Sequence, residues 1–229
     1  MAPITLGDTA VRDLRALLDN AVSDSQNSLP NATIVLLGDG KHTATELFDY
    51  SAAGDDSGIG DIHWMASCTK LITAISCMQL VESGALRLDD PDQIETICPE
   101  FKDLQVLQDD GILVDKKSKI TLRMLLTHTD WVGIIIQRVS NMTLNEYFDQ
   151  YVFQPLEIKD VTLVPPQEMV DRLVGMWQRE KDGHITRIPQ PLARMLDAKQ
   201  RSGAFQSGGG GIFGNIREYG SGSMSPPSP

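Results

Sequence analysis

Ser67 and Lys70 combine residue type and spacing in a way that could support chemistry, because they stand three positions apart at the start of an apolar, helix-forming run. Positions i and i+3 share one face of a helix, so the hydroxyl and the amine can meet. The amine could then take the serine proton, and unpaired N–H groups at the helix start could stabilise an oxyanion. The spacing is that of serine acyl-transfer enzymes. A helix cap followed by a solvated lysine has the same spacing of serine and lysine. The flanking sequence must therefore distinguish a catalytic pair from a structural one.

The amino-acid composition and net charge indicate which classes of molecule the protein is expected to bind. The 229 residues are 41% hydrophobic and 22% charged, as in an ordinary globular protein, and the net charge is −11. With no long block of lysine or arginine, this charge argues against nucleic acid and anionic membranes as partners. The first residues resemble no signal peptide, and no apolar run is long enough to span a bilayer.

The three cysteines, Cys68, Cys77 and Cys98, form no Cys-x-x-Cys pair. They favour free thiols in a reducing compartment, so we expect a cytoplasmic protein. Cys68 stands beside Ser67, but no histidine is placed to activate it, and we expect it to be a small buried filler.

Hydrophobic periodicity predicts the elements that must position Ser67 and Lys70. An amphipathic helix over residues 8–22 precedes a strand at residues 31–37, whose hairpin partner is residues 46–50. The helix that carries the serine covers residues 66–82 and ends at Gly84. Later helices are predicted at residues 121–126, 130–139 and 143–153, and the last begins with a capping box of Thr143 and Glu146.

Three blocks of sequence then occur in order. The first, Met-Ala-Ser-Cys-Thr-Lys-Leu-Ile-Thr-Ala at residues 65–74, is followed by Gln-Leu-Val-Glu-Ser-Gly-Ala-Leu-Arg-Leu-Asp-Asp at residues 79–90. The second is Ile-Thr-Leu-Arg-Met-Leu-Leu-Thr-His-Thr at residues 120–129, and the third is the glycine-rich stretch of residues 207–219. Together they resemble the serine β-lactamase-related family, which includes class C β-lactamases, esterases and fungal transesterases. The stretch after Asp130 and Trp131 is most similar to lovastatin-type transesterases.

The resemblance implies a fold and a mechanism. The fold would be α/β (α+β), a β-lactamase/transpeptidase-like antiparallel sheet flanked by helices, with a helical region. It would form one domain over residues 1–219, and the Gly/Ser/Pro-rich residues 220–229 would be a disordered tail. Ser67 would be the acyl-accepting nucleophile and Lys70 its activating base. No metal or organic cofactor is implied, and the partners would be a small-molecule acyl donor and acceptor.

This chain also departs from the family pattern. Relatives carry a long stretch with a proton-shuttling tyrosine between the Leu-Leu-Thr-His-Thr and Asp-Trp blocks, whereas here Thr129 runs directly into Asp130. The glycine-bearing strand that relatives carry beyond the glycine-rich block is also expected to be lacking. Each loss should reduce the rate about a hundredfold or more. The incomplete sheet would leave an edge exposed, from which we expect marginal stability or self-association.

Two hypotheses follow from these observations. The first is a serine acyltransferase or esterase acting on a small ester or thioester, with transfer favoured over hydrolysis. The alternative is a catalytically impaired remnant or pseudoenzyme.

Other motifs favour simpler interpretations. Gly209, Gly211 and Gly214 match a dinucleotide fingerprint, but without a preceding strand they indicate a tight turn entering a helix. His128 is expected to be a hydrogen-bonded structural residue, and Tyr147 and Tyr151, four positions apart, are expected to pack in the core.

Overall fold

The computed structural model describes residues 6–23, 28–38, 46–53, 58, 60–201 and 203–224. The chain divides into two compact units, each assembled from separate stretches of sequence. The first, here called the sheet unit, draws on Met1–Met65, Phe153–Ala204 and Ile212–Pro229. The second, the helical unit, comprises Ala66–Val152 and Phe205–Gly211. Helices and small antiparallel sheets build both, and the α/β fold class predicted from the sequence is confirmed.

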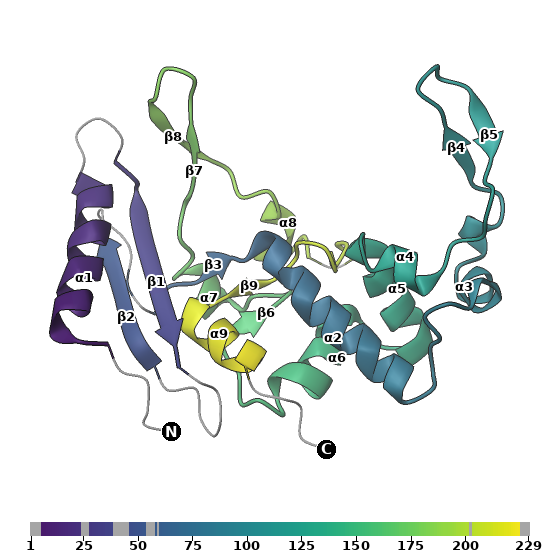
Figure 1. Ribbon diagram of the computed structural model, residues 1–229, viewed down its shortest axis with the longest axis horizontal. Coiled ribbons are helices and arrows are strands. Elements are labelled where there is room, and N and C mark those ends of the chain that lie inside the picture. Colours follow the sequence, from purple (N-terminus) through teal and green to yellow (C-terminus); the bar gives the residue numbers. More distant parts are fainter. Residues whose placement is uncertain are drawn as a thin grey trace. The chain divides into compact units, whose positions relative to one another are not determined.

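An antiparallel hairpin with a helix against it opens the sheet unit (Figure 1). β1 (Asn31–Leu37) pairs with β2 (Glu46–Ala53), and the register begins at Asn31 opposite Ala53. The helix α1 (Asp8–Ser23) packs its apolar positions on this hairpin. Leu18, Phe48 and Ala52 form the buried centre of that contact.

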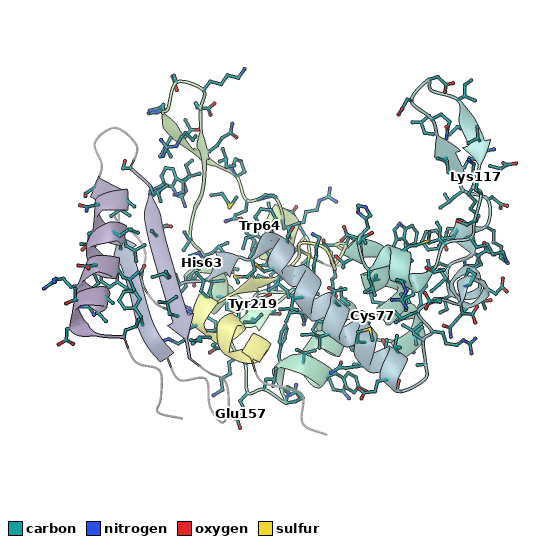
Figure 2. All side chains as sticks on the ribbon, viewed as in Figure 1. His63, Trp64, Cys77, Lys117, Glu157 and Tyr219 are labelled. Carbon is teal, nitrogen blue, oxygen red and sulfur yellow. The ribbon has the colours of Figure 1, made fainter. Side chains whose placement is uncertain are left out.

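A second small sheet has the strand order β3-β9-β6, with antiparallel pairing throughout. Its strands are β3 (His63–Trp64), β6 (Val161–Thr162) and β9 (Phe213–Gly214), and Figure 2 labels His63 and Trp64 on the first of them. The fully buried Ile62 and Phe213 anchor a cluster with Met169 of α7 (Gln167–Val170) and Met195 of α8 (Ala193–Leu196). The hairpin of β7 (Met176–Arg179) and β8 (Ile185–Ile188) completes the described strands of this unit.

The helical unit is organised around the helix that carries Ser67 and Lys70. A short 3-10 turn, η1 (Ala66–Cys68), leads into α2 (Thr69–Glu82), which contacts α5 (Thr129–Ser140) and α6 (Leu144–Phe148). Between α2 and α5 the chain forms α3 (Pro91–Ile97), η2 (Pro99–Phe101), the β4 (Gln105–Leu107) and β5 (Leu113–Asp115) hairpin, and α4 (Leu122–Leu125). Buried apolar side chains of α2, α5 and α6 form the core, among them Ile72, Val132, Ile136, Leu144 and Phe148.

Local signals in the sequence explain several element boundaries. Gly84 takes a φ of +78° just beyond α2, a backbone conformation that favours glycine at a helix end. The capping box of Thr143 and Glu146 is present at the start of α6. The helix expected to reach residue 153 instead changes at Asp149 into a π-helical turn, Asp149–Phe153.

Two expectations are wrong. Residues 220–224, expected to lie in a disordered tail, belong to the helix α9 (Ile216–Met224), which contacts β1; residues 225–229 lie outside the described residues. Cys68, expected to be buried, is exposed; it is the last residue of η1, a turn in which no residue is buried. Cys77 and Cys98 are buried, and burial raises the pKa of the Cys77 thiol to about 11 (Figure 2).

None of the helices in the described part of the chain combines the length and apolarity needed to cross a bilayer. The expected single domain over residues 1–219 stays a prediction, as does self-association through an exposed sheet edge.

Candidate active site

The local backbone presents Ser67 at the start of α2. Ala66 has a φ of +45°, in the left-handed region that non-glycine residues rarely adopt, and turns the chain sharply into η1. Thr69 Oγ1 donates a 2.7 Å hydrogen bond to the Ala66 carbonyl and so ties this turn to the helix. Ser67 is exposed, and N–H groups in the first turn of a helix have no partner within that helix. The serine hydroxyl therefore stands in a setting that suits a developing negative charge.

Lys70 contacts Ser67 directly. Its Nζ donates a 2.9 Å hydrogen bond to Ser67 Oγ and a second, 2.8 Å long, to the carbonyl oxygen of Gly209. The Gly209 contact holds the amine at the serine side of α2 instead of letting it extend into solvent. The structure thus brings together both residues that the sequence singled out, and it adds an anchoring group 139 positions away that the spacing alone did not indicate.

A glycine-rich turn at residues 207–211 supplies that anchor, and Asp130 holds the turn in shape. Asp130 Oδ1 accepts a 2.6 Å hydrogen bond from the Ser207 hydroxyl and a 3.0 Å bond from the Gly209 N–H. Ser207 Oγ in turn accepts from the Gly210 N–H at 2.9 Å. A single carboxylate at the start of α5 thereby fixes the peptide whose carbonyl contacts Lys70.

The turn lies very close to its neighbouring helices, and glycine is what permits the approach. A Cβ at Gly208 would lie 2.6 Å from the Thr129 carbonyl oxygen and 3.2 Å from the Gly133 Cα. Thr73, one turn beyond Lys70 on α2, donates a 2.7 Å hydrogen bond to the Gly208 carbonyl. The glycine turn is therefore held by α2 on one side and by α5 on the other.

Sequence reasoning did not assign a role to Asp130 or Ser207. Two signals could have suggested one: an acidic residue in the first turn of a predicted helix, and a serine that opens a run of glycines. The run was instead predicted to be a tight turn entering a helix. It is a turn, but it enters β9 first, and α9 follows that strand.

The expectations for the aromatic residues and for His128 have mixed outcomes. Tyr147 is buried as expected, but Tyr151 is exposed, so the expectation that it packs in the core is wrong. The centroids of the two rings lie 4.6 Å apart. The Tyr147 hydroxyl lies 3.5 Å from the Ser76 carbonyl oxygen. Ser76 is nine residues after Ser67, which is about 13 Å along the helix axis. The His128 side chain is exposed and forms no hydrogen bond within the described residues, so its expected structural role is wrong.

A serine and a lysine are thus in contact at a helix start and face a glycine turn in an α/β protein. The Beta-lactamase family model matches residues 10–129, which is more than half of the chain. The chain therefore belongs to the beta-lactamase family.

Its relatives include fungal acyltransferases and an esterase. Lovastatin esterase of Penicillium rubens is 28% identical over 177 residues, which are 52% of this chain and 44% of that protein. Monacolin J acid methylbutanoyltransferase of Aspergillus terreus is 25% identical over 213 residues, which cover 68% of this chain and 50% of that protein. Acyltransferase calJ of Penicillium decumbens is 42% identical over 73 residues, which cover 30% of this chain and 17% of that protein. The chain spans about half the length of the first and second of these relatives.

Solved structures share the fold. Unliganded simvastatin synthase (LovD) from Aspergillus terreus, as its selenomethionyl derivative, matches with a TM-score of 0.74 at 20% identity, over 94% of this chain and 67% of that one. EstCE1, a hydrolase with promiscuous acyltransferase activity, matches with a TM-score of 0.65 at 15% identity, over 93% of this chain and 72% of that one. At these identities the likeness establishes the β-lactamase-like fold that the sequence resemblance predicted.

Proposed function

We propose that this chain is a serine acyltransferase or esterase that forms an acyl-enzyme on Ser67. The observation that carries the proposal is the 2.9 Å contact between Lys70 Nζ and Ser67 Oγ, with the amine also anchored on the Gly209 carbonyl. Membership of the beta-lactamase family and the acyltransferase and esterase names of the relatives support the same chemistry.

In the proposed first step, Ser67 Oγ attacks the carbonyl carbon of a small ester or thioester. Lys70, as a neutral amine, accepts the hydroxyl proton across the same 2.9 Å contact. A new ester bond forms between Ser67 Oγ and the acyl carbon, and the bond from that carbon to the leaving oxygen or sulfur breaks. The proton passes from Lys70 to the leaving alcohol or thiol.

In the second step the oxygen of an acceptor alcohol, or of water, attacks the acyl carbon, and the bond from that carbon to Ser67 Oγ breaks to release the new ester or the free acid. The attacking group gives its proton to Lys70, which returns it to Ser67 Oγ. Backbone N–H groups in the first turn would stabilise the negative charge in both steps. We favour transfer over hydrolysis, because monacolin J acid methylbutanoyltransferase, a transferase by name, is similar to 68% of this chain.

The direct test is intact-mass spectrometry after incubation with a serine-reactive fluorophosphonate. We expect a single adduct whose peptide contains Ser67, which Ser67→Ala abolishes. Ser83→Ala is the matched control, since Ser83 is an exposed serine at the other end of α2 and should leave the adduct unchanged. The absence of an adduct on folded protein would overturn the proposal and favour the catalytically impaired remnant.

A reactive acyl thioester extends the test to turnover. Wild-type protein should release free thiol faster than Ser67→Ala, and an added alcohol should divert the acyl group from water into a new ester. Equal thiol release by both proteins would contradict acyl-enzyme formation at Ser67.

A further inference from the structure

The sheet unit contains a cavity of about 820 Å³ that the proposed chemistry at Ser67 does not use. Its wall includes residues of the β7–β8 hairpin and of the segment between α7 and β7. Leu29, Val174 and Ile185 supply apolar surface there. Polar and charged groups make up the larger part of the wall, so the cavity combines apolar surface with several polar groups. Cavities of several hundred cubic ångströms are the usual setting for small-molecule binding.

Two hydrogen-bond donors converge on one point of this wall. Trp177 and Arg187 are directly paired across β7 and β8, so their side chains lie on the same face of the hairpin. A Cβ built at Gly175 would lie 3.1 Å from Arg187 Nε, 3.2 Å from Trp177 Nε1 and 3.4 Å from Arg187 Nη2. Because Gly175 has no side chain, the space beside these donors stays open.

Arg187 has no charge partner among the described residues, whereas the other charged groups of the wall are engaged. Arg172 donates to Asp160 Oδ2 at 2.8 Å and to the Gly60 carbonyl. Asp171 accepts from the Gln167 amide, and Asp61 accepts from the Gly58 N–H. The Arg187 guanidinium and the Trp177 N–H each lack an acceptor within the part of the chain that the structure describes.

We propose that this cavity binds a small organic acid, with its carboxylate on Arg187 and Trp177 and its apolar body along the wall. A planar guanidinium offers paired N–H donors that match a carboxylate, and the indole N–H adds a further donor beside them. The nearby carboxylates of Asp61 and Asp171 disfavour a doubly charged phosphate, which is why a singly charged acid fits better.

The probe pair for the test is cyclohexaneacetate and its neutral amide, cyclohexaneacetamide, with inorganic phosphate as a third ligand. Saturation-transfer NMR titrations on the full chain give the dissociation constants. We expect the acid to bind at least about tenfold more tightly than the amide, the size of one charge-assisted hydrogen bond. Arg187→Gln should remove that preference, and Trp177→Phe and Gly175→Ala should each weaken acid binding several-fold.

Matched variants distinguish binding in this cavity from binding elsewhere on the protein. Arg194→Gln removes an exposed cation of α8 that is not part of the cavity wall, and should leave acid binding unchanged. Ser67→Ala should also leave it unchanged, which distinguishes failure here from failure at the proposed nucleophile. The proposal would be overturned if the acid did not bind, or if the amide or phosphate bound as tightly as the acid. It would also be overturned if Arg187→Gln bound the acid with the same preference over the amide as the wild-type protein. Circular dichroism of Arg187→Gln verifies that the variant is folded.

Discussion

Gly208→Ala should disrupt the contact between the glycine turn and α5. The added Cβ would lie 2.6 Å from the Thr129 carbonyl oxygen, about 1 Å closer than ordinary van der Waals contact. The opposing atoms belong to the backbone of α5 at Thr129 and Gly133, so no side chain can rotate away. The turn itself must move, and overpacking of this kind costs about 1–3 kcal/mol.

The displacement should also reach the proposed active site. Gly209 follows Gly208 directly, and its carbonyl accepts the 2.8 Å hydrogen bond from Lys70 Nζ. A shift of the turn by a few tenths of an ångström or more would weaken that anchor and let the amine leave Ser67. We therefore expect Gly208→Ala to lower both the urea midpoint of unfolding and the rate of fluorophosphonate labelling.

Gly210→Ala is the matched control for stability, because it makes the same chemical change in the same turn. The nearest atoms to its added Cβ lie 3.9 Å away, which is ordinary contact. The control should change the free energy of unfolding by less than about 0.5 kcal/mol. If Gly208→Ala matched Gly210→Ala in its urea midpoint, the inference that glycine is required for the close approach to α5 would be refuted.

Three further predictions concern charged groups of the helical unit. Lys70→Met should slow fluorophosphonate labelling about a hundredfold or more while the protein stays folded, because the proposed base is lost; an unchanged labelling rate would remove lysine from the mechanism. Asp130→Asn should lower the free energy of unfolding by about 1 kcal/mol and slow labelling, because a charged acceptor of two hydrogen bonds becomes neutral; urea melts and labelling equal to wild type would show that the carboxylate does not hold the turn. Hydrogen bonds from Lys119 and Lys116 lower the pKa of Glu95 below its ordinary value of 4.5. Its stabilising effect should therefore be complete above about pH 4.5 and disappear as the pH falls through the lowered pKa. Thermal melts of Glu95→Gln and wild type should differ at pH 7 and converge in acid, and a constant difference would contradict the assignment.

Much of the local structure could be predicted from residue patterns. The helical spacing of the apolar residues in 8–22 identified α1, and the short continuous apolar run of residues 31–37 identified β1. The capping box at Thr143 and the glycine after α2 marked helix ends through hydrogen bonds and backbone conformations within a few residues. The β4–β5 and β7–β8 hairpins were not predicted. The side chains of β4 and β5 are exposed, so neither strand alternates between a buried and an exposed face.

The sequence by itself determined that Ser67 and Lys70 could meet, because their separation is fixed by the geometry of a single helical turn. It could not determine what holds the lysine or shapes the turn opposite. Gly209 is 139 positions from Lys70, and Ser207 is 77 positions from Asp130. Contacts over such separations arise only when packing brings distant segments together, and here they depend on glycines small enough to let the turn lie directly against α5.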